Sequence, residues 1–264
     1  MAPHVSVVGE ADLAARLATP GASGTRRVVV IGGPVDDRVA RAAQAVSEGA
    51  HAFLLWPPAP AAAAAEALAD RAEEAGVQVG VARPLGATEA LAGIPAGWAA
   101  RLVTLSLVAR PDGPLAEAGW ATLLAGALDV CATLADARAV ARMDAVAERD
   151  GDALRAVVLA VRFENRAYAQ ATVRFSDHVA DDEVALYAAR PGSRVEARSL
   201  AGPLCVEAEG HAAPLATVPA LADGPETEAT AFVAAIAAGR PAPYTLDHAL
   251  ATLRLAERAQ EKLR

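Results

Sequence analysis

The sequence predicts two domains: an α/β domain with a parallel sheet, then an α+β domain with an open, mostly antiparallel sheet and flanking helices. Three observations carry this prediction. Strand and helix patterns alternate three times over residues 1–82, as in a doubly wound sheet. From residue 154 onward, apolar and polar residues alternate, which is typical of antiparallel strands with one solvated face. Helical spacing returns at residue 223. We place the domains at residues 1–98 and 99–264.

Four strands are predicted in the first domain, at residues 5–8, 28–31, 52–55 and 77–81. Residues 28–31 are a β-branched run without alternation, as expected when helices cover both faces of a parallel sheet. Three helices are predicted between them, and the second of these begins at Asp36 or Asp37 as its N-cap and ends at Gly49. The first and third helices are predicted at residues 11–18 and 61–75.

The second domain opens with a predicted strand at residues 102–108 and a helix at about 117–135. Apolar residues recur on that helix at helical spacing and predict its buried side. They are Trp120, Leu124, Leu128, Cys131 and Leu134. Two alternating segments then flank a turn at Asn165 and Arg166, and two more strands pivot on Pro191.

Two helices complete the second domain. Asp223-Gly-Pro opens the first helix and Gly239 closes it. Thr245 is the predicted N-cap of the second helix, because a threonine side chain can accept a hydrogen bond from the first turn.

Composition excludes several functional classes. The chain has 24 Lys+Arg against 32 Asp+Glu, a net charge of −8, which argues against a nucleic-acid surface. Two cysteines and five widely spaced histidines give neither a disulfide framework nor a metal-ligand pattern. The start of the chain lacks the pattern of a signal peptide, and no apolar run is long enough to span a bilayer. We therefore expect a cytoplasmic protein without a metal site, a nucleic-acid partner or a membrane partner.

Three stretches of the sequence, in this order, carry a resemblance to a known family. Residues 47–57 are similar to a Gly-Lys-His-Val strand that leads into Glu-Lys-Pro. Residues 152–175 are similar to a strand pair joined by Asn-Gly, with Arg166 in place of the glycine. Residues 226–243 are similar to a Glu-rich helix with Phe, followed by Gly-x-Pro. Together they resemble the glucose–fructose oxidoreductase, inositol dehydrogenase and rhizopine-catabolism (Gfo/Idh/MocA) family. The resemblance implies a Rossmann domain, NAD(P)-dependent oxidoreduction and association through the open sheet.

The departures from this family concern its chemistry. Trp56 stands where the family has its catalytic lysine, and Lys262 is the only lysine of the chain. An indole carries one N–H donor and no charge, so it cannot replace an amine in proton transfer. Thr122 and Gly126 stand where the family has an Asp-x-x-x-His pair, whereas the family's companion carboxylate is retained as Asp129. We therefore expect no catalytic residues at these positions.

The phosphate-binding loop of the family also lacks a clear counterpart. On the alignment that matches residues 47–57, the first βαβ unit is absent, so the first domain is a truncated Rossmann-like domain. A rival alignment places a degenerate Gly-x-Ala-x-x-Ala fingerprint at Gly9, where the methyl group of Ala11 obstructs pyrophosphate. Glu10 and Asp12 would also place negative charge beside the phosphate. We expect no bound cofactor, and NAD or NADP at Gly9 stays the alternative.

Three functional hypotheses follow. The preferred one is a pseudoenzyme, a non-catalytic assembly or accessory subunit that pairs with itself or with a full-length oxidoreductase relative. Its interface candidates alternate along one strand of the open sheet. They are Tyr168, Gln170, Thr172 and Arg174.

The second hypothesis is a cofactor-independent enzyme, or a binder of a sugar-like small molecule, with a cleft formed by Trp56, Arg83 and Asp129. Trp56 can stack on a ring. Arg83 can hold an anion or form a surface ion pair, and Asp129 can be a cleft carboxylate or make a hydrogen bond from helix to sheet. The third hypothesis is an NAD(P)-dependent oxidoreductase, which requires a working Gly9 loop.

Overall fold

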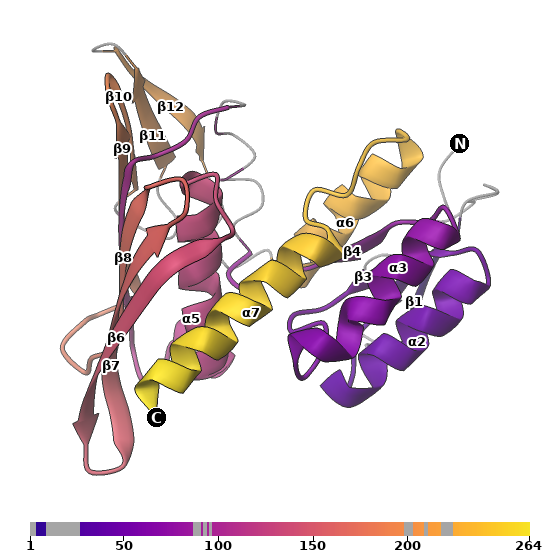
Figure 1. Ribbon diagram of the computed structural model, residues 1–264, viewed down its shortest axis with the longest axis horizontal. Helices are drawn as coiled ribbons and strands as arrows, with labels where there is room; N and C mark the ends of the chain where they lie inside the picture. Colours follow the sequence, from indigo (N-terminus) through magenta and orange to yellow (C-terminus); the bar gives the residue numbers. More distant parts are fainter. Residues whose placement is uncertain are drawn as a thin grey trace. The chain divides into compact units, whose positions relative to one another are not determined.

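The computed structural model describes residues 4–8, 27–86, 91, 94, 97–197, 203–208, 211–217 and 224–264 (Figure 1). The chain divides into two compact units. Unit 1 comprises Met1–Thr88 and Asp223–Arg254, and unit 2 comprises Glu89–Ala222 and Leu255–Arg264. The sequence boundary at residues 98 and 99 assigns both C-terminal helices to the second domain. The compact units instead group most of these two helices with the first sheet, for the packing reason given below.

Unit 1 contains a Rossmann-like parallel sheet of four strands, whose order in space, β1-β2-β3-β4, equals their order in the sequence. The strands are His4–Val8 (β1), Arg27–Ile31 (β2), His51–Leu54 (β3) and Val79–Val81 (β4). The helical segments are Val35–Ser47 (α2), Ala62–Ala65 (η1), Glu66–Glu74 (α3), Gly224–Ala237 (α6) and the first half of Leu246–Leu263 (α7), whose second half belongs to unit 2. The four predicted strands are confirmed to within about two residues, and the helix predicted at 11–18 lies outside the described residues.

Both faces of this sheet are buried because successive residues of a strand point to opposite faces. Val29 and Leu54 belong to a cluster with α2, α3 and the first turns of α7. Val28 and Phe53 belong to a second cluster, on the other face, with α6. Residues 28–31 of β2 and 52–54 of β3 are therefore all apolar, and the sequence shows no alternation there.

The contact between α6 and the sheet depends on a glycine. A Cβ added to Gly80 would lie 2.5 Å from the Cδ2 atom of Phe232 and 3.2 Å from the Cδ2 atom of Phe53. The two phenylalanine rings pack with their centroids 5.4 Å apart. Gly80 therefore allows a close approach that a side chain would prevent.

The helix caps of unit 1 agree in part with the sequence. The backbone N–H of His248 donates to Oγ1 of Thr245 (3.4 Å), so the predicted cap of α7 is confirmed. The predicted cap of α2 is wrong, because Pro34 is the N-cap and no side chain caps the helix. Asp36 and Asp37 lie instead in the first turn, where their charge complements the helix dipole.

Unit 2 contains an eight-stranded open sheet of order β12-β11-β10-β9-β5-β8-β7-β6, in which only β5 and β8 pair in parallel. The strands are Leu102–Ala109 (β5), Val140–Asp150 (β6), Ala153–Phe163 (β7), Tyr168–Phe175 (β8), Glu183–Arg190 (β9), Ser193–Ala197 (β10), Pro203–Ala208 (β11) and His211–Thr217 (β12). The prediction of an open, mostly antiparallel sheet is confirmed. The sequence analysis missed β6, β11 and β12.

One helix, Pro114–Leu134 (α5), lies along one face of the unit 2 sheet (Figure 1). Its predicted stripe is buried at Leu124, Leu128, Cys131 and Leu134, and Trp120 packs edge-on against Phe175 with centroids 4.8 Å apart. The segment Leu115–Leu134 has the length and hydropathy of a membrane span, but 61% of it is buried within the protein. Gly119 also breaks the helix with a φ of 75°. The apolar character of α5 therefore follows from its place in the core.

We expect Gly80→Ala to lower the free energy of unfolding by about 1–3 kcal/mol, because the new methyl group overlaps the Phe232 ring. Chemical denaturation measures this change. In a Phe232→Leu background, which makes room for the methyl group, the same substitution should cost less. An equal cost in both backgrounds would show that the ring does not restrict this position.

Candidate functional site

The loops at the carboxyl edge of the parallel sheet are the first place to look for a site. Three strands end in short connections: Gly32-Gly33-Pro34 follows β2, Leu55-Trp56-Pro57 follows β3, and Ala82-Arg83-Pro84 follows β4. Parallel strands end at the same edge, which is where ligands bind in open α/β sheets. Trp56 and Arg83 therefore occupy positions suited to a site.

Arg38, in the first turn of α2, forms hydrogen bonds with the loops that follow β2 and β3. Its Nε and Nη2 atoms donate to the carbonyl oxygen of Gly33 at 2.9 and 2.7 Å. Its Nη1 atom donates to the carbonyl oxygens of Leu55 (3.1 Å) and Pro57 (2.7 Å). A guanidinium group suits this task because its donors lie in a fixed plane. The sequence analysis missed this residue.

Trp56 lies between the two carbonyl groups that Arg38 holds. Its side chain is partly buried and packs against the cluster of α2 and α3. The peptide bond between Trp56 and Pro57 is cis. The indole contributes apolar surface and a single N–H donor, so this strand end provides packing and no proton-transfer group.

Arg83 is held by the C-terminal helices of unit 1. Its backbone N–H donates to Oε2 of the buried Glu228 (3.0 Å) on α6. Its guanidinium group lies over the Tyr244 ring, 4.6 Å from the centroid. Tyr244 in turn shares a hydrogen bond of 2.9 Å with Thr252 and stacks on His248. These contacts give Arg83 a structural role within unit 1.

Asp129, the third cleft candidate, lies in unit 2. Its carboxylate is 1% exposed and forms an ion pair with Nη1 of Arg138 (3.4 Å), just before β6. A buried carboxylate requires such a partner. The pair joins α5 to the segment that leads into the sheet. On the same helix, Thr122 is half-buried and Gly126 is buried.

Cys131 is not a nucleophile candidate. Burial, with a smaller contribution from the charge of Asp129, raises the pKa of its thiol to about 12. The thiol is therefore neutral near pH 7, and only a thiolate reacts.

The described residues contain no group of three or more His, Cys, Asp or Glu side chains that could hold a metal ion. Two histidines of unit 1 make hydrogen bonds within the fold. Nδ1 of His51 accepts a hydrogen bond from the backbone of Gln78 (2.9 Å), and His248 belongs to the Thr245 cap.

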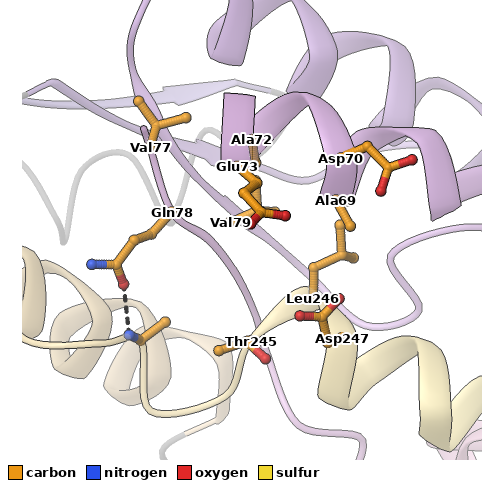
Figure 2. A pocket seen from close by; sticks show the side chains of 11 residues that line it. Ala69, Asp70, Ala72, Glu73, Val77, Gln78, Val79, Thr245, Leu246 and Asp247 are labelled. Atoms are coloured by element: carbon orange, nitrogen blue, oxygen red, sulfur yellow. Dashed lines mark hydrogen bonds between the residues drawn. The ribbon is translucent and has the colours of Figure 1, made fainter. Parts of the chain in front are cut away.

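A groove of about 370 Å³ lies between α3, the start of β4 and the start of α7 (Figure 2). Gln78 on its wall donates to the carbonyl oxygen of Arg240 (3.1 Å) and accepts from the backbone of Ala242 (2.7 Å). The carboxylates at its rim, Asp70, Glu73 and Asp247, are exposed to solvent. The groove lies at the amino end of β4, away from the three loops. We assign no ligand to it.

The open face of the unit 2 sheet carries the four predicted interface residues. Tyr168, Gln170 and Arg174 are exposed and Thr172 is half-buried, because alternate residues of β8 face α5. The structure describes five exposed large hydrophobic residues. Four of them, Leu102, Val146, Tyr168 and Tyr187, lie on this face. Exposed apolar residues gathered on one face are typical of interaction surfaces.

No protein-family profile and no curated protein sequence matches the chain. Solved structures of oxidoreductases share its fold. UDP-N-acetylglucosamine 3-dehydrogenase GnnA from Acidithiobacillus ferrooxidans has a TM-score of 0.72 and 19% identity over 89% of this chain and 77% of its own. An Agrobacterium radiobacter oxidoreductase, in complex with NAD⁺, L-tartaric acid and magnesium, has a TM-score of 0.70 and 14% identity over 90% and 78%. GenD2 from gentamicin A biosynthesis, in complex with NAD, has a TM-score of 0.62 and 18% identity over 89% and 75%. The chain thus has the fold of NAD-binding oxidoreductases.

We expect Arg38→Gln to lower the free energy of unfolding by about 2–3 kcal/mol, at roughly 1 kcal/mol for each of the three carbonyl groups it binds. Urea denaturation followed by circular dichroism measures this. Arg41→Gln is the matched control, because Arg41 lies on the same helix in an exposed pair with Asp37 and should cost under about 0.5 kcal/mol. An equal decrease in the free energy of unfolding of the two variants would show that the hydrogen bonds of Arg38 do not stabilise the fold.

Proposed function

We propose that this protein is a non-catalytic relative of the Gfo/Idh/MocA oxidoreductases, a pseudoenzyme that serves as an assembly or accessory subunit. One observation carries the proposal. Trp56 occupies the strand end where the resemblance places a catalytic lysine, and it is packed against the core between two carbonyl groups fixed by Arg38. This strand end is packed against the core, and its indole supplies neither an acid nor a base.

The second catalytic position supports the same proposal. The resemblance places an Asp-x-x-x-His pair at Thr122 and Gly126 on α5, and neither residue exchanges a proton near pH 7. Only the companion carboxylate Asp129 is present, and its ion pair with Arg138 gives it a structural use. The chain keeps the fold but lacks the reactive side chains. This combination is expected of a protein that serves in assembly and does not catalyse a reaction.

The sheet order supports the absence of a dinucleotide. In a Rossmann fold the cofactor lies across the point where the strand order reverses. The four described strands of unit 1 run in sequence order without such a reversal. The Gly9 loop lies outside the described residues, and several proteins with this fold contain NAD or NADP. An NAD(P)-dependent oxidoreductase is therefore the main competing function.

A small-molecule site around Trp56, Arg83 and Asp129 has less support. Each of the three side chains is engaged: Trp56 packs on the core, Arg83 stacks on Tyr244, and Asp129 pairs with Arg138. A ligand would have to compete with these contacts.

We expect no saturable heat of binding when the full chain is titrated calorimetrically with NAD or NADP, which sets any dissociation constant above about 1 mM. The Agrobacterium radiobacter oxidoreductase of the same fold, whose structure contains NAD⁺, is the positive control. Binding in the micromolar range would contradict a pseudoenzyme and favour the oxidoreductase.

We expect the purified chain to exceed its monomer mass of 26.8 kDa in light scattering, either alone or with a co-purified oxidoreductase. Tyr168→Ala should weaken the assembly, because it removes exposed apolar surface beside Leu102 on the open face. Arg41→Glu in unit 1 is the control and should leave the mass unchanged. A monomer that binds no oxidoreductase would overturn the assembly role.

A further inference from the structure

We infer that the outer edge of β1 is a further interaction surface, to which β1 of a second copy of this chain adds as an antiparallel strand. The parallel sheets of the two copies then form one continuous sheet across a two-fold axis at Ser6. This surface lies in unit 1, so the inference does not depend on the assembly role of the open face in unit 2. It is carried by a comparison of the sheet edges and by the direction of the backbone groups of β1.

Three of the sheet edges in the described part of the chain are guarded against pairing with another chain. Proteins guard such edges with a covering segment, charged residues, proline or bulges. The segment before α7 covers β4, where the N–H of Val81 donates to the carbonyl oxygen of Tyr244 (3.1 Å) and Gly80 forms a bridge with Thr245. β6 has charged residues at most of its exposed positions and shifts its register twice against β7. β12 contains Pro214 and shifts its register once against β11.

The fourth edge, at β1, has none of these guards among the residues that the structure describes. The strand His4–Val8 contains no lysine, arginine, acidic residue or proline. It pairs with β2 at all five positions without a shift of register. Val8 is 39% exposed, and it is the only exposed large hydrophobic residue described in unit 1. Apolar surface at an unguarded edge is typical of a strand that pairs with another chain.

The hydrogen bonds between β1 and the β2 segment show which backbone groups face outward. The carbonyl oxygen of Val8 accepts from the N–H of Gly32 (2.9 Å), so the backbone groups of Val8 point toward β2. The N–H and C=O groups of one residue point to the same side of a strand, and this side alternates along the strand. Those of Ser6 therefore also point toward β2, whereas those of Val5 and Val7 face outward. Both valines can thus bond to another strand through an N–H and a C=O group.

The helices that cover this sheet are placed over its central strands. α2 packs on β2 and β3. The cluster that contains α6 includes Val28 and Val30 of β2 and Phe53 of β3. A strand can therefore add to β1 in the plane of the sheet without displacing these helices.

A second copy of β1 fits this edge when it runs antiparallel, with Ser6 opposite Ser6. Val5 of each copy then lies opposite Val7 of the other, and each such pair exchanges two hydrogen bonds, which uses all the outward groups. Cross-strand pairs of β-branched side chains add stability. The exposed Val8 lies opposite His4, and no acidic or basic pair of like charge meets.

The register and the identity of the partner follow from the same geometry. A shift by one residue would set outward groups against inward ones, and a shift by two would leave one valine without a partner inside β1. A two-fold pair also occupies the edge of both copies, so the assembly closes and does not grow into a fibre. A second copy of this chain therefore satisfies the edge completely.

A pair of five-residue strands is a small interface, and small interfaces belong to weak complexes. The test therefore traps the pair with a disulfide. In an antiparallel ladder, opposite residues that exchange no hydrogen bonds have their Cα atoms about 4.5 Å apart, which is within the range of a disulfide. Ser6 is the residue in this position on the two-fold axis.

The test uses Ser6→Cys in the full chain, oxidised by glutathione disulfide and followed as covalent dimer on non-reducing gels. Two thiols are oxidised for each glutathione disulfide that is reduced. The variant should crosslink at least about 10-fold faster than Ser47→Cys, because pairing raises the effective concentration of the introduced thiols. Ser47 is exposed at the end of α2 and is the matched control. The native chain, which has Cys131 and Cys205, gives the background rate.

Val7→Pro, added to the Ser6→Cys chain, tests whether the backbone of β1 forms the contact. It removes an outward N–H from each copy and leaves the hydrogen bonds between β1 and β2 in place. Half of the intermolecular hydrogen bonds are lost, so crosslinking should slow at least about 10-fold. Val7→Thr keeps both the N–H and the β-branched shape, and it should keep the rate within about 3-fold.

Each outcome decides the inference. A Ser6→Cys chain that crosslinks no faster than Ser47→Cys overturns it, and so does an equal slowing by Val7→Pro and Val7→Thr. Tyr168→Ala should leave the crosslinking rate unchanged, and a crosslink that disappears with this substitution would belong to the open face. A crosslink that persists while the open face binds nothing supports pairing at β1 and overturns the assembly role alone. Thermal unfolding of each variant shows whether a change acts through stability.

Discussion

The need to cover both faces of the parallel sheet organises unit 1. Strands that keep their sequence order in space, joined by right-handed crossovers, place their crossover helices on one face. α2 and α3 accordingly pack on the face that carries Val29 and Leu54. Neither helix reaches the face of Val28, Val30 and Phe53, which α6 covers from a distant part of the chain. The divided sequence of unit 1, and the glycine that admits the Phe232 ring, follow from this constraint.

The sequence predicted those parts of the fold in which local chemistry and tertiary packing agree. The uninterrupted β-branched run at residues 28–31 identified a strand buried on both faces, and Thr245 identified the start of α7. β6 was missed because Met143 is its only buried residue and charged residues fill most of its exposed positions. The grouping of α6 with the first sheet was missed because periodicity shows that a helix has an apolar side and does not show which surface that side covers.

The sequence showed which catalytic side chains the candidate site lacks, but it did not show which contacts its residues make. The residues that replace lysine and histidine can be read directly from the sequence, and their chemistry follows from their side chains. The role of Arg38 could not be predicted from the sequence. An arginine in the first turn of a helix gives the same sequence pattern whether its side chain is in solvent or binds three carbonyl groups. Arg83 and Asp129 likewise looked available as ligands, whereas the fold supplies each with a partner.

The interruption of unit 1 by unit 2 matters for synthesis on the ribosome. β1 to β4 leave the exit tunnel long before Phe232 and Ile236, so the nascent chain carries one bare apolar face through most of translation. The sheet of unit 2 emerges in the interval and can close on α5 without waiting for α6. The sheet that is made first is therefore covered on its second face only after α6 has been made, and until then this apolar face is exposed to solvent.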